Sequence, residues 1–190
     1  GMKAETDKRR GLGIFDKVLL AMQNLMAAGV PYGVSVTATK NNAKLLSKDK
    51  FYDYCFKELR VSYMWIFQYM PIGREITMDL MLTPKQRVEL FKEWKKVVTE
   101  KNYFVADFWN SGMLSDGCIS CGRSGGYFYI DWDGKIMPCV FVPYYKETIY
   151  EVYDSGRSLA DALQSDLFVK GREWQEGYIG IKTGKMQNCL

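Results

Sequence analysis

Apolar and polar residues recur along this chain with two different periods, and the changes between them predict alternating helices and strands. Apolar positions three and four residues apart over residues 14–29 predict a helix that Gly29 would end. From Tyr32 to Thr39 the period is two, which would place aliphatic side chains on one side of a strand and hydroxyls on the other. A barrel strand whose lumen end meets a polar ligand has this pattern, and an antiparallel strand with one solvated face is the alternative.

The same order of elements repeats further along the chain. The other predicted elements are a helix over 48–59, a strand over 61–70, a helix over 84–99 begun by Thr83 and Pro84, a strand over 103–108, and helices from Ser158 and over 166–174. We expect residues 140–153 to be irregular. Helices that alternate with strands predict an α/β layer with parallel strands.

A short hairpin is predicted after Cys118 and Cys121 and before Cys139. Two apolar and aromatic runs, 127–132 and 135–137, flank Asp133-Gly134, which is a strong hairpin signal. Folding it would bring Cys139 towards Cys118 and Cys121, so that these thiols could face one metal. A hairpin is too small to bury a core and often needs such a clasp. Iron, zinc or no metal at all are compatible with the spacing alone.

Composition narrows the class of protein. The 190 residues include five tryptophans and are 47% hydrophobic, which indicates a globular chain with one core, or one core and a small appendage. The net charge of +4 is spread over segments of mixed sign, so we expect no nucleic-acid partner. No apolar run reaches membrane-spanning length and no secretory signal is visible, so we expect a cytoplasmic protein without a membrane partner.

Cysteine and histidine usage restricts the chemistry. Five cysteines, an odd number in a chain without a secretion signal, favour reduced thiols or metal over a disulfide framework. Histidine is absent, which excludes Ser-His-Asp and Cys-His nucleophile arrangements and most catalytic zinc sites. We assign no catalytic residue.

The cysteine spacing resembles a known family. Cys121, twelve residues, Gly134, four residues and Cys139 is similar to the first half of the auxiliary iron-sulfur motif of SPASM and twitch domains, which follow the barrel in many radical S-adenosylmethionine (SAM) enzymes. Cys118, which is separated from Gly134 by fifteen residues, fits nearly as well. Other segments resemble that barrel in chain order: residues 7–18 the segment after its fourth strand, 34–39 its fifth strand, and 64–73 its sixth.

This resemblance implies a fold and a set of site residues. The fold would be α/β: a partial (β/α) barrel over residues 1–110, then a cysteine-bearing β-hairpin with helices over 111–190, truncated at its C-terminus. The parent protein would use SAM and a 4Fe-4S cluster. The implied residues are Arg10, Ser35, Thr37, Tyr69, Pro71 and Gly73 for SAM, Asp107 and Asn110 for substrate, and Cys118, Cys121, Cys139 and Cys189 for metal.

The chain also departs from the family. The Cys-x-x-x-Cys-x-x-Cys motif that binds the radical-generating cluster is absent. We therefore expect a fragment that lacks the first half of the barrel. It would be inactive by itself and could be isolated without a bound cofactor. Its parent would act on a peptide or small metabolite, and the exposed barrel edge predicts either a homodimer or a compensating rearrangement. The alternative function is a small zinc-binding or interaction module with structural cysteines.

Overall fold

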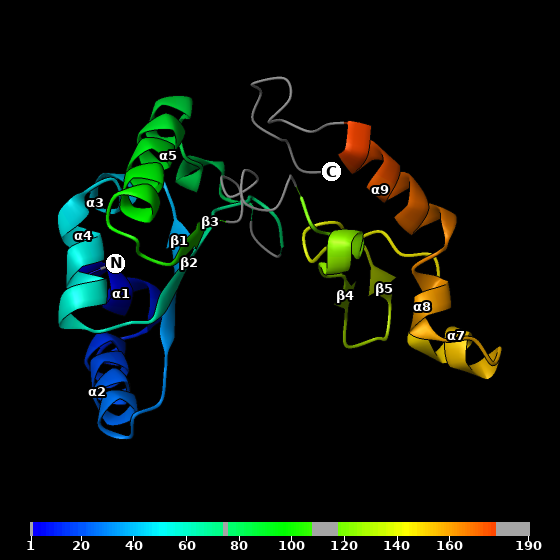
Figure 1. Ribbon diagram of the computed structural model, residues 1–190, viewed down its shortest axis with the longest axis horizontal. Helices are drawn as coiled ribbons and strands as arrows, with labels where there is room; N and C mark the ends of the chain where they lie inside the picture. The colour runs from blue at the N-terminus through cyan, green and yellow to red at the C-terminus, as the bar shows by residue number, and fades with distance from the viewer. Residues whose placement is uncertain (1, 74–75, 108–117, 178–190) are drawn as a thin grey trace. The chain divides into compact units, whose positions relative to one another are not determined.

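The chain folds into two compact units, residues 1–109 and 110–190 (Figure 1). Each unit has its own hydrophobic core. The computed structural model describes residues 2–73, 76–107 and 118–177. Among these residues, no helix is both long and apolar enough to cross a membrane.

Unit 1, residues 1–109, contains a three-stranded sheet. Its strands are β1 (Gly33–Ala38), β2 (Tyr63–Gln68) and β3 (Val105–Asp107). They lie in the order β1-β2-β3, and both neighbouring pairs are parallel. Each β-α-β connection supplies the long crossover that parallel pairing requires. The prediction of a parallel α/β layer is therefore confirmed, and the antiparallel alternative for the strand after Pro31 is wrong.

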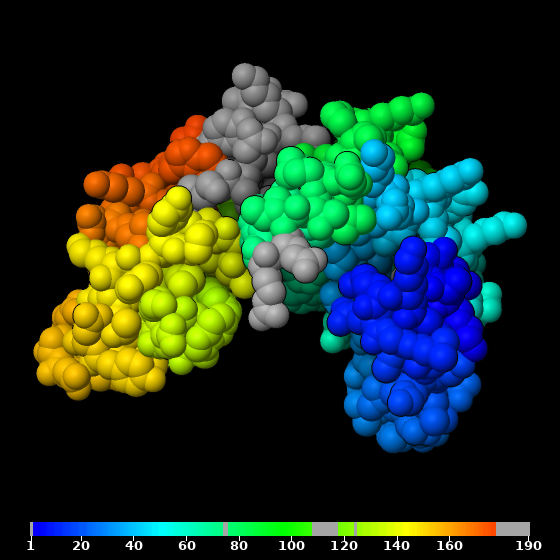
Figure 2. All heavy atoms as spheres, turned by 180° about the vertical axis from the view of Figure 1, so that it is seen from behind, coloured from blue at the N-terminus to red at the C-terminus, as the bar shows by residue number. Residues whose placement is uncertain are grey.

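Helices of unit 1 accompany this sheet. They are α1 (Lys3–Arg10), α2 (Ile14–Ala27), α3 (Ala43–Leu46), α4 (Asp49–Asp53), a π-helical turn η1 (Tyr54–Glu58), a 3₁₀ turn η2 (Met78–Leu80) and α5 (Pro84–Thr99). Gly29 adopts φ +67° just after α2, a conformation that suits glycine at a helix end. Helices α1 and α2 contact each other and form one blue surface in Figure 2.

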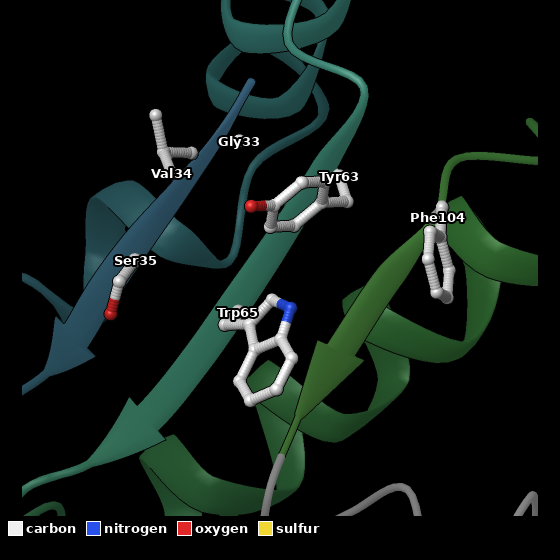
Figure 3. Close-up of a pocket in the computed structure, with 6 residues that line it drawn as sticks. All are labelled: Gly33, Val34, Ser35, Tyr63, Trp65 and Phe104. Atoms are coloured by element: carbon white, nitrogen blue, oxygen red, sulfur yellow. The ribbon is translucent and has the colours of Figure 1, made fainter. Parts of the chain in front are cut away.

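The core of unit 1 lies between one face of the sheet and the helices. Met64, Ile66 and Val105 are almost fully buried in it together with Leu90 and Trp94 of α5. The indole Nε1 of Trp94 donates a hydrogen bond of 2.9 Å to the carbonyl oxygen of Val105, so the helix is tied to β3 as well as packed on it. On the opposite face of the sheet, Tyr63 and Trp65 are 39% and 41% exposed (Figure 3).

Helix α5 begins where the sequence predicts. The Thr83 hydroxyl accepts a hydrogen bond from the Gln86 backbone, and the Gln86 side chain accepts one from the Thr83 backbone, with Pro84 at the first helical position. This reciprocal cap satisfies two backbone donors at once.

Unit 2, residues 110–190, contains a two-stranded antiparallel hairpin. Strands β4 (Tyr129–Ile130) and β5 (Ile136–Met137) pair on either side of Asp133-Gly134, and a 3₁₀ turn η3 (Arg123–Gly125) precedes them. Gly134 has φ +80°, and the Asp131 carboxylate accepts hydrogen bonds from two backbone N–H groups of the turn, at 3.0 and 2.9 Å. The turn is therefore held by its own side chain and by glycine's freedom.

The described residues of unit 2 also form helices α7 (Ile149–Asp154), α8 (Leu159–Ala162) and α9 (Asp166–Gly177). The Ser158 cap on α8, closed by Asp161, agrees with the sequence prediction. The prediction that residues 140–153 are irregular is wrong at its C-terminal end, because Thr148 and Glu151 form a capping box that starts α7. Val152 of this helix is fully buried, so α7 contributes to the core of unit 2.

Candidate functional site

One predicted site lies at the carboxyl end of β1 and β2. Ser35 and Thr37 alternate with the residues that face the helices, as the period of two predicts, and they pair across the strands with Trp65 and Phe67. Just beyond the strands, the Tyr69 backbone N–H donates to the Ala38 carbonyl at 2.8 Å. Thr37 and Tyr69 thus come from neighbouring strands at the end of the sheet where α/β proteins bind ligands.

The segment after β2 continues this edge. Pro71 in this segment is half-buried, and Gly73 is exposed with φ +98°. The Tyr69 hydroxyl accepts a hydrogen bond of 3.3 Å from the Thr77 backbone N–H. A polar ligand at this edge would meet backbone groups as well as side chains.

The other residues predicted to contact SAM or substrate are placed differently. Arg10 is exposed at the last position of α1, the helix that packs on α2. Asn110 lies outside the described residues. Asp107 ends β3 and is completely buried, in register with Ile66, on the side of the sheet that faces the helices.

Asp107 has a buried neighbour that the sequence analysis did not identify. Gln68, at the end of β2, directs its Nε2 at both carboxylate oxygens of Asp107, at 3.4 and 3.5 Å. Both side chains are buried, Gln68 with 7% of its surface exposed. Burial, and next to it the charge of Asp107, raise the pKa of Tyr52, so this tyrosine also lies near the carboxylate. The carboxylate of Asp107 is therefore enclosed between the ends of β2 and β3 and helix α4.

The second predicted site is the cysteine loop of unit 2, residues 118–122. Cys118 is half-buried and Cys121 is fully buried. The Ser120 hydroxyl lies between them, 3.2 Å from Cys118 Sγ and 3.9 Å from Cys121 Sγ. Cys121 and Gly122 both have positive φ, +60° and +68°, so the chain turns sharply after the second thiol. The Cys121 backbone N–H donates to the Pro138 carbonyl at 2.9 Å, which brings the loop against the hairpin arm that carries Cys139.

Cys139 is 4% exposed and has two polar neighbours. The Tyr127 hydroxyl lies 3.0 Å from its Sγ, and the Phe141 backbone N–H donates to it at 3.4 Å. Donors of this kind stabilise the thiolate form, which is the form that binds metal. The sequence shows Tyr127 only as one of many aromatics, so its role could not be found from the pattern.

Helix α9 fixes the loop from the other side. Arg172 donates to the Cys121 carbonyl at 3.0 Å, and Gln175 Nε2 donates to the Ser120 hydroxyl at 2.9 Å. Gln175 is 1% exposed, and its Oε1 has no hydrogen-bond partner within the described part of the chain. Gly171 faces Cys121 so closely that a methyl group on it would lie 2.6 Å from the sulfur.

The pKa of Cys121 depends on its burial and on the two neighbouring cysteines. Burial raises the pKa of Cys121, and the charges of Cys118 and Cys139 raise it further, while the Ser120 hydrogen bond and Arg172 lower it. Cys121 therefore remains a neutral thiol near pH 7 unless a cation replaces its proton.

The donor set of this loop fits a thiolate-bound metal group, with two sulfurs on one turn, a third on the hairpin arm, and polar donors around them. Among the residues that the structure describes, no three Cys, Asp or Glu side chains are already grouped so as to hold a metal ion. The predicted fourth ligand, Cys189, lies outside the described residues.

Comparison with known proteins identifies relatives of this chain. No protein-family model matches it. It is 30% identical over 208 residues to the mycofactocin maturase MftC of two Mycobacterium tuberculosis strains, CDC 1551 and H37Rv, and the match covers 100% of this chain and 49% of the relative. The chain thus spans about half the length of the curated relatives it matches.

Solved structures share the fold. Crystal structures of Streptococcus suis SuiB, one of them bound to S-adenosylmethionine, match 80% of this chain with a TM-score of 0.57 and 15% identity. The match covers 39% and 38% of those chains. The α/β fold of parallel strands and helices is therefore one that this chain shares with SuiB.

Proposed function

We propose that this chain is part of a radical SAM enzyme, and that its unit 2 holds an auxiliary iron-sulfur cluster. The observation that carries this proposal is the backbone hydrogen bond from the Cys121 N–H to the Pro138 carbonyl, which brings the cysteine loop against the hairpin arm that carries Cys139. The similarity to MftC over the whole chain and the fold shared with a SAM-bound structure support it.

In this proposal each group of residues has a task. Cys118, Cys121 and Cys139 hold the cluster, with Cys189 as a fourth ligand. With Cys139 bound to the cluster as a thiolate, the Tyr127 hydroxyl and the Phe141 N–H would both donate to its sulfur. When bound, an iron-sulfur cluster supplies one-electron transfer.

Unit 1 would contribute the SAM side of the site. Thr37 and Ser35 present hydroxyls to the methionine or ribose groups, and Tyr69, Pro71 and Gly73 line the adenine. Arg10 would pair with the carboxylate, and Asn110 would face the substrate, a peptide or small metabolite. The 190 residues contain no Cys-x-x-x-Cys-x-x-Cys motif, so we propose that this chain alone does not cleave SAM.

The turn at Cys121-Gly122 supports a second candidate, a structural zinc site, because two cysteines on one sharp turn also suit a tetrahedral ion. Elemental analysis of anaerobically purified chain separates the two functions. Several iron atoms with matching sulfide per chain would support the cluster, and one tightly held zinc with no iron would support the structural module. Cys55→Ser, a change at a buried thiol in unit 1, is the control that should leave the metal content unchanged.

A further inference from the structure

The Ser120 hydroxyl lies inside the cysteine loop and is shielded from water, because only 1% of the residue is exposed. Its oxygen is 3.2 Å from Cys118 Sγ, 3.9 Å from Cys121 Sγ and 2.9 Å from Nε2 of Gln175. A hydroxyl group has one proton to donate and two lone pairs that accept. The groups around Ser120 therefore decide which way this proton points.

The amide of Gln175 acts on Ser120 as a donor. Its Nε2 also lies 3.3 Å from the Ser120 carbonyl oxygen, so the two amide protons serve two oxygens of one residue. Exchanging the amide nitrogen and oxygen would set Oε1 against that carbonyl, and two acceptors do not pair. Gln175 is itself 1% exposed, so bulk water does not offer its amide another partner. The Ser120 backbone thus fixes the orientation of the amide.

The sulfurs complete the direction of this relay. Because Gln175 occupies a lone pair of the hydroxyl, the hydroxyl proton is left for the sulfurs, of which Cys118 is the nearer. A thiolate accepts hydrogen bonds and has no proton to donate, and a hydroxyl that receives a hydrogen bond donates a stronger one. We propose that Gln175 is a positioning residue that acts through Ser120, whose hydroxyl donates to the metal-bound thiolate of Cys118. This rests on the proposed function, in that the loop cysteines bind a metal.

Helix α9 is suited to hold Gln175 in place. Gly171 and Gln175 are four residues apart and share a helix face, and Gly171 lies against the Cys121 sulfur. Arg172 donates to the Cys121 carbonyl oxygen at 3.0 Å. The helix therefore meets the cysteine loop at three positions, and a donor carried by a helix keeps its geometry better than a donor on a loop.

The relay has a consequence that a merely structural contact would lack. A hydrogen bond to a cysteine sulfur withdraws charge from it, which raises the reduction potential of a bound cluster. The same withdrawal moves the sulfur-to-metal absorption to shorter wavelength, because the electron leaves the sulfur less readily. Removing the donor should therefore change the absorption as well as the affinity for metal.

Co²⁺ titration of the full 190-residue chain, reduced and free of oxygen, tests the relay. Ser120→Ala should bind Co²⁺ about 10-fold more weakly than wild type and move the sulfur-to-metal band to longer wavelength. Gln175→Met keeps the length of the side chain without the donor and should change both in the same direction. The double variant should bind no more weakly than Ser120→Ala, because Gln175 acts through that hydroxyl. Gln23→Met, at an exposed position of α2, is the control and should match wild type.

Circular dichroism of the metal-free variants checks that their helices remain. If Gln175→Met unfolds, Ser120→Ala decides by itself, because it removes a single oxygen atom. An unchanged band and affinity in Ser120→Ala would overturn the relay, as would a double variant whose loss equals the product of the two single losses. A wild-type chain that binds no Co²⁺ would overturn the metal site and the relay together. The expected Co²⁺ results without cluster formation from iron and sulfide would refute the cluster alone.

Discussion

The Tyr127 hydroxyl lies 3.0 Å from Cys139 Sγ, which connects the start of the hairpin to the cysteine at its far end. A thiolate can only accept a hydrogen bond, so in the metal-bound state the tyrosine is the donor. The contact is thus one that strengthens when the thiol loses its proton.

Replacing this donor should weaken metal binding. We expect Tyr127→Phe to bind Co²⁺, a spectroscopic probe for thiolate sites, about 10-fold or more weakly than wild type, since partners of metal ligands commonly contribute this much. Tyr129→Phe on β4 is the control and should bind as wild type does. Titration followed by the sulfur-to-metal absorption measures both, and equal affinity in the three proteins would contradict the assigned role.

A methyl group at Gly171 should disturb the cysteine loop. Its Cβ would lie 2.6 Å from Cys121 Sγ, so either the helix or the sulfur must move. Overpacking of this kind costs about 1–3 kcal/mol, which exceeds the gain of about 1 kcal/mol that alanine brings to a helix. We expect Gly171→Ala to lower the free energy of unfolding of unit 2 and to weaken metal binding. Gly177→Ala has no atom within 4 Å of the added methyl group and should do neither.

A pair of carboxyl groups between α4 and α5 should make unit 1 sensitive to pH. Burial and the neighbouring Asp49 raise the pKa of Glu93 to about 7, whereas the hydrogen bond with Glu93 and then Lys96 lower the pKa of Asp49 to about 2. Lys101 also pairs with Asp49, at 3.6 Å. Unfolded chains would protonate Glu93 only near 4.5. Between pH 4.5 and 7 the folded state therefore holds more protons, and its stability falls as the pH rises.

Glu93→Gln should remove this fall in stability, because an amide can donate to Asp49 at any pH. We expect the wild type to lose about 1 kcal/mol between pH 5 and pH 8, a value reduced by the water that reaches the pair. Urea unfolding at four pH values measures it. Glu89→Gln, at an exposed position of the same helix, should keep the wild-type slope, and a flat wild-type profile would refute the raised pKa of Glu93.

The buried amide of Gln68 should stabilise the ends of the strands. Its Nε2 is directed at the Asp107 carboxylate, and Gln68→Leu would take that donor away from a fully buried charge. We expect a loss of about 1–3 kcal/mol in the free energy of unfolding of unit 1. Gln23→Leu, an equivalent change at an exposed position of α2, should cost far less. Similar losses in both would show that the buried contact is unimportant.

Much of the architecture follows from local sequence rules. The alternation after Pro31, the Thr83-Pro84 start and the Ser158 cap each depend on neighbouring residues, and each appears where the pattern predicts it. The capping box at Thr148 follows the same rules, but the aromatic residues around it obscured the helix periodicity. Rules that use only neighbouring residues thus predict an element where one hydrophobic period runs through the whole segment.

The surroundings of the candidate sites could not be predicted in the same way. Arg172 and Gln175 reach the cysteine loop from about 50 residues away, and nothing in the spacing of α9 indicates that contact. Asp107 is likewise a substrate residue by resemblance, whereas the register of β3 turns it towards the helices. Such contacts depend on tertiary packing, which a sequence period does not encode.

The most direct test of the central claim is the visible absorption of the chain after anaerobic reconstitution with iron and sulfide. Wild type should develop charge-transfer bands at roughly 400 nm, and Cys139→Ala should lose them, while Cys55→Ala should keep them because that thiol lies in the core of unit 1. Bands of equal strength in Cys139→Ala, or none in the wild type, would contradict a cluster held by the hairpin cysteines.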